Sequence, residues 1–358
     1  MENKVFRFIT NKSLKSWEKI ATKILSETSR VYDYLPPSEV SVIKFEENLL
    51  KKFQENHHYF SINKPLVGHV STNLDDIQIT QKVLIEAYDA FQDPFVLEQV
   101  TGEILAKVLA YRNLKKGMIF YIPWICDKKM DLIPYEVDRV FDLWKSMRAF
   151  GLRPLDRRHA CILLFRGTDL SLVSKSSRIS IISNFDPKGP GYSIYIHAKR
   201  KIHEWMKKVS NKHHKIKTIG YSLGGAFSSY LLFSEPQFFS ETSSSLLFHQ
   251  PGLIDENLEK FIKAEKEHSF KVRSFIAEGD PVSKYGYLFC DSIGLRLYDK
   301  IMMPIEAHTQ LFSALNSFEA RRIDLSKENS SESRKFYSNL HTKTSKLLYR
   351  LGLRLLLP

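Results

Sequence analysis

The spacing of apolar residues divides the chain into a helical first part and a mixed second part. Up to about residue 115, apolar side chains recur every three or four positions, which predicts helices over 14–34, 40–60 and 75–111. Prolines interrupt this series at positions 36, 37 and 65. We therefore expect a helical N-terminal region, residues 1–116, that either caps the following domain or binds a partner.

Beyond residue 117, predicted strands and helices alternate. Continuous or alternating apolar runs predict strands over 118–125, 160–165, 213–219, 246–247 and 272–277. Helical spacing predicts helices over 133–150, 192–209, 226–233 and 257–264. This alternation is typical of an α/β domain with a mostly parallel central sheet flanked by helices, which we assign to residues 117–325.

The last segment has a composition of its own. Residues 326–333 are rich in Ser and Glu and predict a linker. Residues 334–358 contain six Lys or Arg, eight Leu and no acidic residue, which predicts a basic amphipathic helix. Such a helix suits peripheral binding to an anionic membrane, and it equally suits packing on the domain with its basic side chains in water.

The charge and the cysteines narrow the classes of partner. A net charge of +13 attracts nucleic acid or anionic lipid. No zinc-finger spacing, RNP-like segment or phosphate loop accompanies it, so we expect no nucleic-acid binding. Cys126, Cys161 and Cys290 form neither a C-x-x-C motif nor a Cys/His cluster, so we expect no disulfide framework and no metal. Cys161 and Cys290 lie in apolar runs and are expected in the core.

Targeting signals are sparse in this sequence. The first residues lack an uninterrupted apolar segment, and no apolar run reaches the roughly 18 residues of a spanning helix. We expect a cytoplasmic protein, or one exported without a cleaved signal peptide, with peripheral membrane association.

One pentapeptide carries recognisable chemistry. Gly220-Tyr221-Ser222-Leu223-Gly224 matches G-x-S-x-G and lies between a predicted strand and a predicted helix, which is the context of a nucleophile elbow. The turn strains the serine backbone, and a side chain at either glycine would crowd the neighbouring elements. The pentapeptide alone arises by chance about once per ten chains of this length, and the alternative is a turn with a capping serine.

A nucleophilic serine needs a base and an orienting carboxylate, in the chain order Ser, acid, His. Asp280 follows the predicted strand 272–277 directly, with Glu278 and Asp291 as weaker alternatives. The histidines downstream of this acid are His308 and His341, and His341 lies in the basic tail. We therefore select Asp280 and His308.

The oxyanion of a tetrahedral intermediate needs hydrogen-bond donors. The backbone N–H of Leu223, the residue after the nucleophile, supplies one. Gly167-Thr168 follows the predicted strand 160–165, so Thr168 can offer its backbone N–H and its hydroxyl, while Gly167 allows close approach.

These motifs together resemble a known family. Phe165-Arg166-Gly167-Thr168 and the elbow resemble the fungal-type class 3 lipases of the α/β-hydrolase fold. Residues 248–252 and 279–282 resemble two further segments of that family, and Gly191-Tyr192 stands where it has Gly-Phe before a helix. The resemblance covers about residues 117–320.

The resemblance implies Ser222 as nucleophile, Asp280 as acid and His308 as base. It implies Thr168 and Leu223 as the oxyanion hole, residues 170–190 as a lid, and hydrolysis of lipid esters through an acyl-enzyme without a cofactor. The chain departs from the family at Tyr221, where the family has histidine, and in a shorter interval between the acid and the base. The alternatives are a small-ester esterase or acyltransferase, and a non-catalytic membrane- or host-interaction protein on a hydrolase scaffold.

Overall fold

The computed structural model describes residues 74–91, 93–126, 129–143, 147–156, 158–168, 183–210, 215–296, 304–312 and 319–350. The helices predicted over 14–34 and 40–60, and most of the predicted lid, lie outside these residues.

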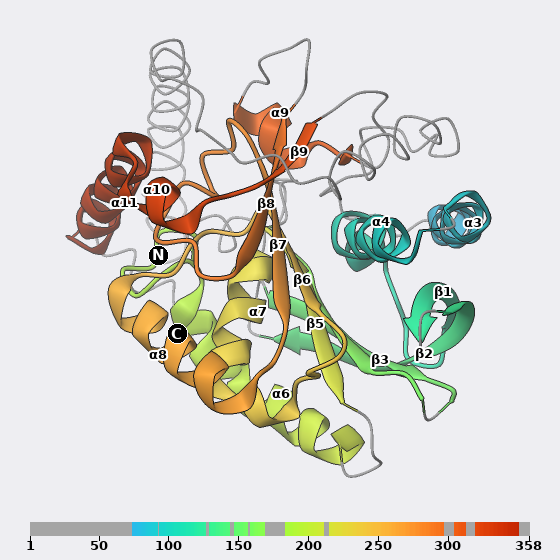
Figure 1. The fold of residues 1–358 in the computed structure, drawn as a ribbon. Coiled ribbons are helices and arrows are strands. Elements are labelled where there is room, and N and C mark those ends of the chain that lie inside the picture. The colour runs from blue at the N-terminus through green and yellow to red at the C-terminus, as the bar shows by residue number, and fades with distance from the viewer. Residues whose placement is uncertain are drawn as a thin grey trace, which may run out of the picture.

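Nine strands of the described residues form one central sheet, in which they lie in chain order (Figure 1). The first strands are β1 (Ile119–Cys126), β2 (Lys129–Leu143), β3 (Met147–Pro154) and β4 (Cys161–Phe165). They are followed by β5 (Ile216–Tyr221), β6 (Ser245–Phe248), β7 (Val272–Ala277), β8 (Asp291–Arg296) and β9 (Glu319–Arg322). Strands β4 to β8 run parallel, and every other neighbouring pair is antiparallel.

The sheet is therefore mixed, and the expectation of a mostly parallel sheet was wrong. Residues 127–128 join β1 to β2, and residues 144–146 join β2 to β3. A parallel pair needs a crossover of about a dozen residues or more. The short connections leave only antiparallel pairing for this end of the sheet.

The helix predicted over 133–150 was also wrong, because these residues form most of β2 and the start of β3. Ile133, Tyr135 and Val137 are buried in strand alternation. The pairing with β3 then shifts between Val137 and Arg139, as in a β-bulge. The extra residue changes the phase of the alternation, so that Phe141 is buried on the opposite face. Because of this change of phase, the apolar residues of β2 are spaced in the sequence as they would be in a helix.

Helices cover both faces of the sheet (Figure 1). One face carries α3 (Leu74–Ala90) and α4 (Pro94–Lys107), followed by the 3-10 turn η3 (Leu109–Tyr111). The other face carries α6 (Tyr192–Ser210), α7 (Leu223–Ser234) and α8 (Asp255–His268), with a 3-10 turn η5 (Pro236–Phe238). Strand β4 alternates between the two cores, which explains its unbroken apolar sequence. Cys161 and Cys290 are buried, as predicted.

The segment predicted as one helix over 75–111 is divided at Asp93. This residue caps α4, because its carboxylate accepts the N–H of Phe95 at 2.9 Å. Helix α4 then lies close to β6: a Cβ at Gly102 would lie 2.5 Å from the Leu246 side chain. Helices α3 and α4 thus share one hydrophobic core with the sheet.

Two helices make up most of the described residues after β9. Residues 326–333, expected as a linker, lie mostly in α10 (Leu325–Ser330) and the start of α11 (Glu332–Arg350). Asp324 begins α10 by accepting the N–H of Ser326 at 3.0 Å, which explains how a Ser/Glu-rich segment becomes helical. Helix α11 packs on the domain through buried Arg334 and Tyr337. Among the described helices, none is both long and apolar enough to cross a bilayer.

Candidate active site

The elbow is a strained turn between β5 and α7. Ser222 has φ 55° and ψ −124°, a left-handed backbone that non-glycine residues seldom adopt. Its N–H donates to the carbonyl of Phe248 at 2.9 Å. A Cβ at Gly224 would lie 2.6 Å from the carbonyl oxygen of Phe165, so the close contact between α7 and β4 requires glycine there.

The structure brings Ser222, His308 and Asp280 together. The Nε2 of His308 lies 2.8 Å from the Ser222 hydroxyl, and its Nδ1 lies 2.9 Å from a carboxylate oxygen of Asp280. Asp280 lies just beyond the carboxyl end of β7, and His308 lies in the last turn of α9 (Pro304–Thr309) rather than before a helix.

The other residues weighed for these roles lie elsewhere. Glu278 pairs with Arg296 at 3.2 Å, and Asp291 pairs with Arg322 at 2.7 Å. His341 donates from its Nε2 to the backbone carbonyl of Asn184 at 2.7 Å.

Asp280 is fully buried and accepts several hydrogen bonds. The Val282 N–H donates to it at 2.9 Å, and the Ser283 hydroxyl donates to its other oxygen. Burial alone would raise the pKa of this carboxyl. Interactions with two neighbouring rings, His308 first and His249 second, outweigh burial and hold the pKa of Asp280 well below its ordinary value. Asp280 is therefore a carboxylate at neutral pH.

The candidate oxyanion site lies beside the serine. A Cβ at Gly167 would lie 2.5 Å from the Tyr221 carbonyl and 3.4 Å from the Ser222 Cβ, so this loop approaches the elbow closely. The Asn184 amide donates to the Thr168 hydroxyl at 3.1 Å, which leaves the hydroxyl proton of Thr168 to donate elsewhere. Leu223 is the first residue of α7, and a helix does not use its first N–H groups.

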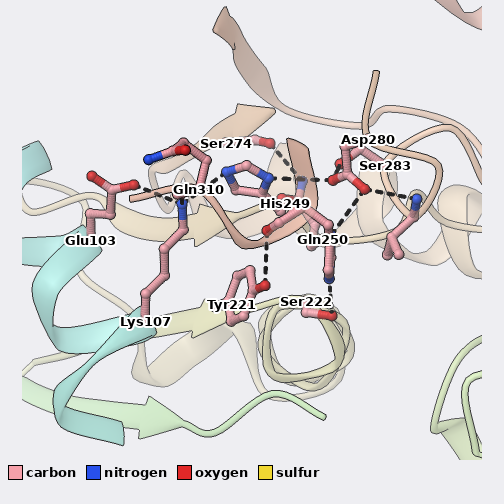
Figure 2. A network of polar contacts seen from close by, with 12 residues as sticks. Glu103, Lys107, Tyr221, Ser222, His249, Gln250, Ser274, Asp280, Ser283 and Gln310 are labelled. Carbon is pink, nitrogen blue, oxygen red and sulfur yellow. Dashed lines mark hydrogen bonds and ion pairs between the residues drawn. The ribbon is translucent and has the colours of Figure 1, made fainter. Parts of the chain in front are cut away.

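Two charged residues and a histidine behind the acid were not identified from the sequence. Glu103 and Lys107 of α4 form a buried pair with 2.7 Å between Nζ and Oε1. Figure 2 shows Lys107 reaching His249, which lies between Lys107 and Asp280. The signal was two charges spaced by four residues in a helix otherwise rich in apolar residues, and a histidine directly after a buried strand.

His249, Asp280 and His308 also have the geometry of a small metal site, because their ligand atoms lie within 4.8 Å of one another. The Lys107 ammonium lies 3.0 Å from one nitrogen of His249, and the Ser222 hydroxyl occupies one nitrogen of His308. A cation beside His249 disfavours a second cation at the same place. The arrangement favours a hydrogen-bonded network over a metal centre.

Comparison with known proteins gives similarity to solved structures alone, since no family model and no curated protein matches the chain. A fungal lipase structure is 12% identical with a TM-score of 0.41, over 76% of this chain and 99% of that one. A triacylglycerol lipase from Penicillium expansum is 12% identical with a TM-score of 0.32, over 58% and 79%.

A lipase from Rhizomucor miehei, solved as a propeptide complex, is 13% identical with a TM-score of 0.34. That match covers 54% of this chain and only 64% of the Rhizomucor miehei chain. The three matches are therefore similarities to solved lipases at 12–13% identity.

Proposed function

We propose that this protein is a serine hydrolase that cleaves carboxylic esters of lipids. The observation that carries the proposal is the unbroken contact from the Ser222 hydroxyl through His308 to the buried Asp280. Ser222 and Asp280 lie at the carboxyl edge of the sheet, and His308 comes from α9, so the three groups meet where parallel strands present catalytic residues.

In the proposed reaction, His308 takes the proton of the Ser222 hydroxyl as the serine oxygen attacks the acyl carbon. The electron pair of the carbonyl moves to its oxygen, which the N–H groups of Leu223 and Thr168 and the Thr168 hydroxyl stabilise. The tetrahedral intermediate then collapses, the ester bond breaks, and the alcohol leaves with the proton from His308. Water attacks the acyl-enzyme by the same sequence and releases the acid.

Asp280 orients His308 and stabilises the imidazolium that forms during each step. The carboxylate of Asp280 can only accept, so the contact assigns the proton of the neutral His308 ring to Nδ1. The Nε2 of His308 is then free to accept the proton of the serine hydroxyl. The reaction needs no cofactor.

The choice of lipid esters over small esters rests on the motifs that resemble class 3 lipases. An ester series separates these readings: p-nitrophenyl esters of short and long acyl chains are assayed with wild type and Ser222→Ala. We expect activity to rise with acyl length and to disappear in the variant. A preference for acetyl esters would favour a small-ester esterase.

A non-catalytic scaffold makes a different prediction. A fluorophosphonate probe should label wild type and leave Ser222→Ala unlabelled. Activity that survives Ser222→Ala, or the absence of labelling in wild type, would reject the catalytic assignment.

We also propose peripheral association with anionic membranes through α11. Lys343 and Lys346 are exposed on this helix, while Tyr337 and Ser345 are buried against the domain. The helix therefore packs on the domain and presents basic side chains to solvent. Packing on the domain and binding to an anionic membrane are compatible in this arrangement. A location at a membrane surface, in the cytoplasm or after export, follows from this proposal.

A further inference from the structure

Lys107 is a fully buried lysine whose ammonium group lies among three polar partners. Its Nζ lies 2.7 Å from Glu103 Oε1, 3.0 Å from His249 Nε2 and 2.5 Å from the carbonyl oxygen of Gln310 (Figure 2). Glu103 is also buried. These residues lie on α4, more than a hundred positions before the nucleophile, yet they reach the neighbourhood of both other members of the candidate triad.

The contacts assign a proton arrangement to this network. A carboxylate and a carbonyl can only accept, so two of the protons on Nζ point to Glu103 and Gln310. If the third proton points to His249 Nε2, the ring carries its own proton on Nδ1, which faces the Asp280 carboxylate at 3.4 Å. The opposite tautomer would set a nitrogen lone pair against that carboxylate. In this arrangement Lys107 is an ammonium paired with Glu103, and His249 is neutral. Burial lowers the pKa of Lys107, and the charge and hydrogen bond of Glu103 oppose that shift.

The contact between His249 and Asp280 is electrostatic. At 3.4 Å it is longer than an ordinary hydrogen bond. In a dry interior even this distance carries a substantial interaction, because little water screens it. Burial, with the Lys107 charge second, lowers the pKa of His249 to about 4, which agrees with a neutral ring.

The same pair holds the chain after the candidate base. Lys107 binds the carbonyl of Gln310, and Glu103 accepts the N–H of Phe312 at 2.9 Å. Both points lie within four residues of His308 and directly follow α9, whose described part has six residues. The two side chains of α4 thus hold the backbone after α9 at two positions.

Replacing a buried ion pair with apolar residues is often neutral or stabilising, so stability is a weak reason for such a pair. We propose that Glu103 and Lys107 form a positioning pair, which fixes His308 through its following backbone and Asp280 through His249. This inference rests on the proposed hydrolase function. It assigns α4 to the support of the active site.

The test removes both charges together, so that no unpaired charge remains buried. The variants are Glu103→Gln/Lys107→Met, His249→Asn, and Lys217→Met as the matched control. Lys217 is another fully buried lysine; it lies against Trp124, and among the described residues its Nζ has no hydrogen-bond partner. Asn tolerates the left-handed backbone of His249, which has φ 51°.

Each variant is measured for thermal midpoint, for the number of sites labelled by a fluorophosphonate, and for kcat and KM per labelled site. For the double variant we expect a thermal midpoint close to wild type, kcat about 10- to 100-fold lower and KM nearly unchanged, since small misplacements of reacting groups have large effects. His249→Asn should lower kcat in the same way, and Lys217→Met should leave it unchanged.

The inference is overturned if kcat per labelled site stays at the wild-type value in the double variant. If the double variant does not fold, an unchanged kcat in His249→Asn overturns it instead. An equal loss of kcat in Lys217→Met also rejects it, because any buried lysine would then matter equally. Failure of the proposed function differs from all of these, since wild type itself would show no Ser222-dependent labelling.

Discussion

Tyr221 holds His308 by both its hydroxyl and its ring. The hydroxyl donates to the His308 carbonyl at 2.8 Å, and the two rings stack with 5.2 Å between centroids and 29° between planes. Tyr221 therefore supports the candidate base at two points, the backbone carbonyl and the ring.

Tyr221→Phe removes this hydrogen bond and keeps the ring. The unpaired carbonyl should lower the free energy of unfolding by about 1–2 kcal/mol. Looser positioning of His308 should lower kcat about fivefold with KM unchanged, which corresponds to roughly 1 kcal/mol in the barrier. Urea unfolding and ester kinetics measure the two effects. Tyr230→Phe is the control, because the buried Tyr230 hydroxyl donates to Pro190 at 3.1 Å on the other face of the sheet. Equal kinetics in the two variants would contradict the role of Tyr221.

Thr168→Val keeps the shape of the side chain and removes the hydroxyl. If the hydroxyl donates to the oxyanion, kcat should fall about 100-fold or more, the usual effect of losing one such donor. Thr168→Ser keeps the hydroxyl and should remain within about tenfold of wild type. Steady-state kinetics on one soluble ester compare the three proteins. Similar rates for the Val and Ser variants would leave only the backbone N–H of Thr168 as a donor.

Acid should destabilise the protein through His249. Burial lowers its pKa from the ordinary 6.5 to about 4 in the folded state. Between these values the unfolded chain binds more protons, so the free energy of unfolding falls as the pH falls, by up to about 1.4 kcal/mol per pH unit. Burial lowers the pKa of His341 in the same direction. The depressed pKa of Asp280 adds stability that is lost below about pH 4.

Urea unfolding at pH 7 and pH 5 measures this loss. His249→Asn should reduce the difference between the two pH values, because one of the buried neutral histidines is gone. Identical pH dependence in wild type and variant would show that His249 does not titrate as its burial requires.

The basic side chains of α11 predict binding to anionic lipid. Lys343→Glu/Lys346→Glu should weaken binding to phosphatidylserine vesicles by about tenfold or more, since each basic residue near such a surface contributes about 1 kcal/mol. Hydrolysis of a soluble ester should be unchanged. The control is Lys263→Glu/Lys266→Glu, an equal change of charge on the exposed side of α8. Vesicle sedimentation measures the binding of both variants. If both lose binding equally, the overall charge, and not α11, governs binding.

Local patterns were sufficient where one element is buried on both faces or carries a turn motif. The runs in β4 and β7 predicted strands, and the glycines around Ser222 predicted a sharp turn between a strand and a helix. Patterns failed where two periodicities mix. The β-bulge at 137–139 shifted the alternation of β2, so that the apolar spacing resembled that of a helix. A different failure concerns α10: composition predicted a linker there, but the cap at Asp324 begins a helix.

The candidate site shows the same division between local and long-range information. By itself the sequence determined the candidate nucleophile and acid and their order along the chain. Each of the two lies in a local turn motif, G-x-S-x-G for the serine and Gly-Asp-Pro for the acid, and such motifs can be recognised without the fold. Only the tertiary structure decided which histidine meets Ser222 and that Lys107 lies behind Asp280. These contacts join residues that are 86 and 142 positions apart. Such pairs leave no periodic trace in a single sequence, since the packing of α4 and α9 against the sheet brings them together.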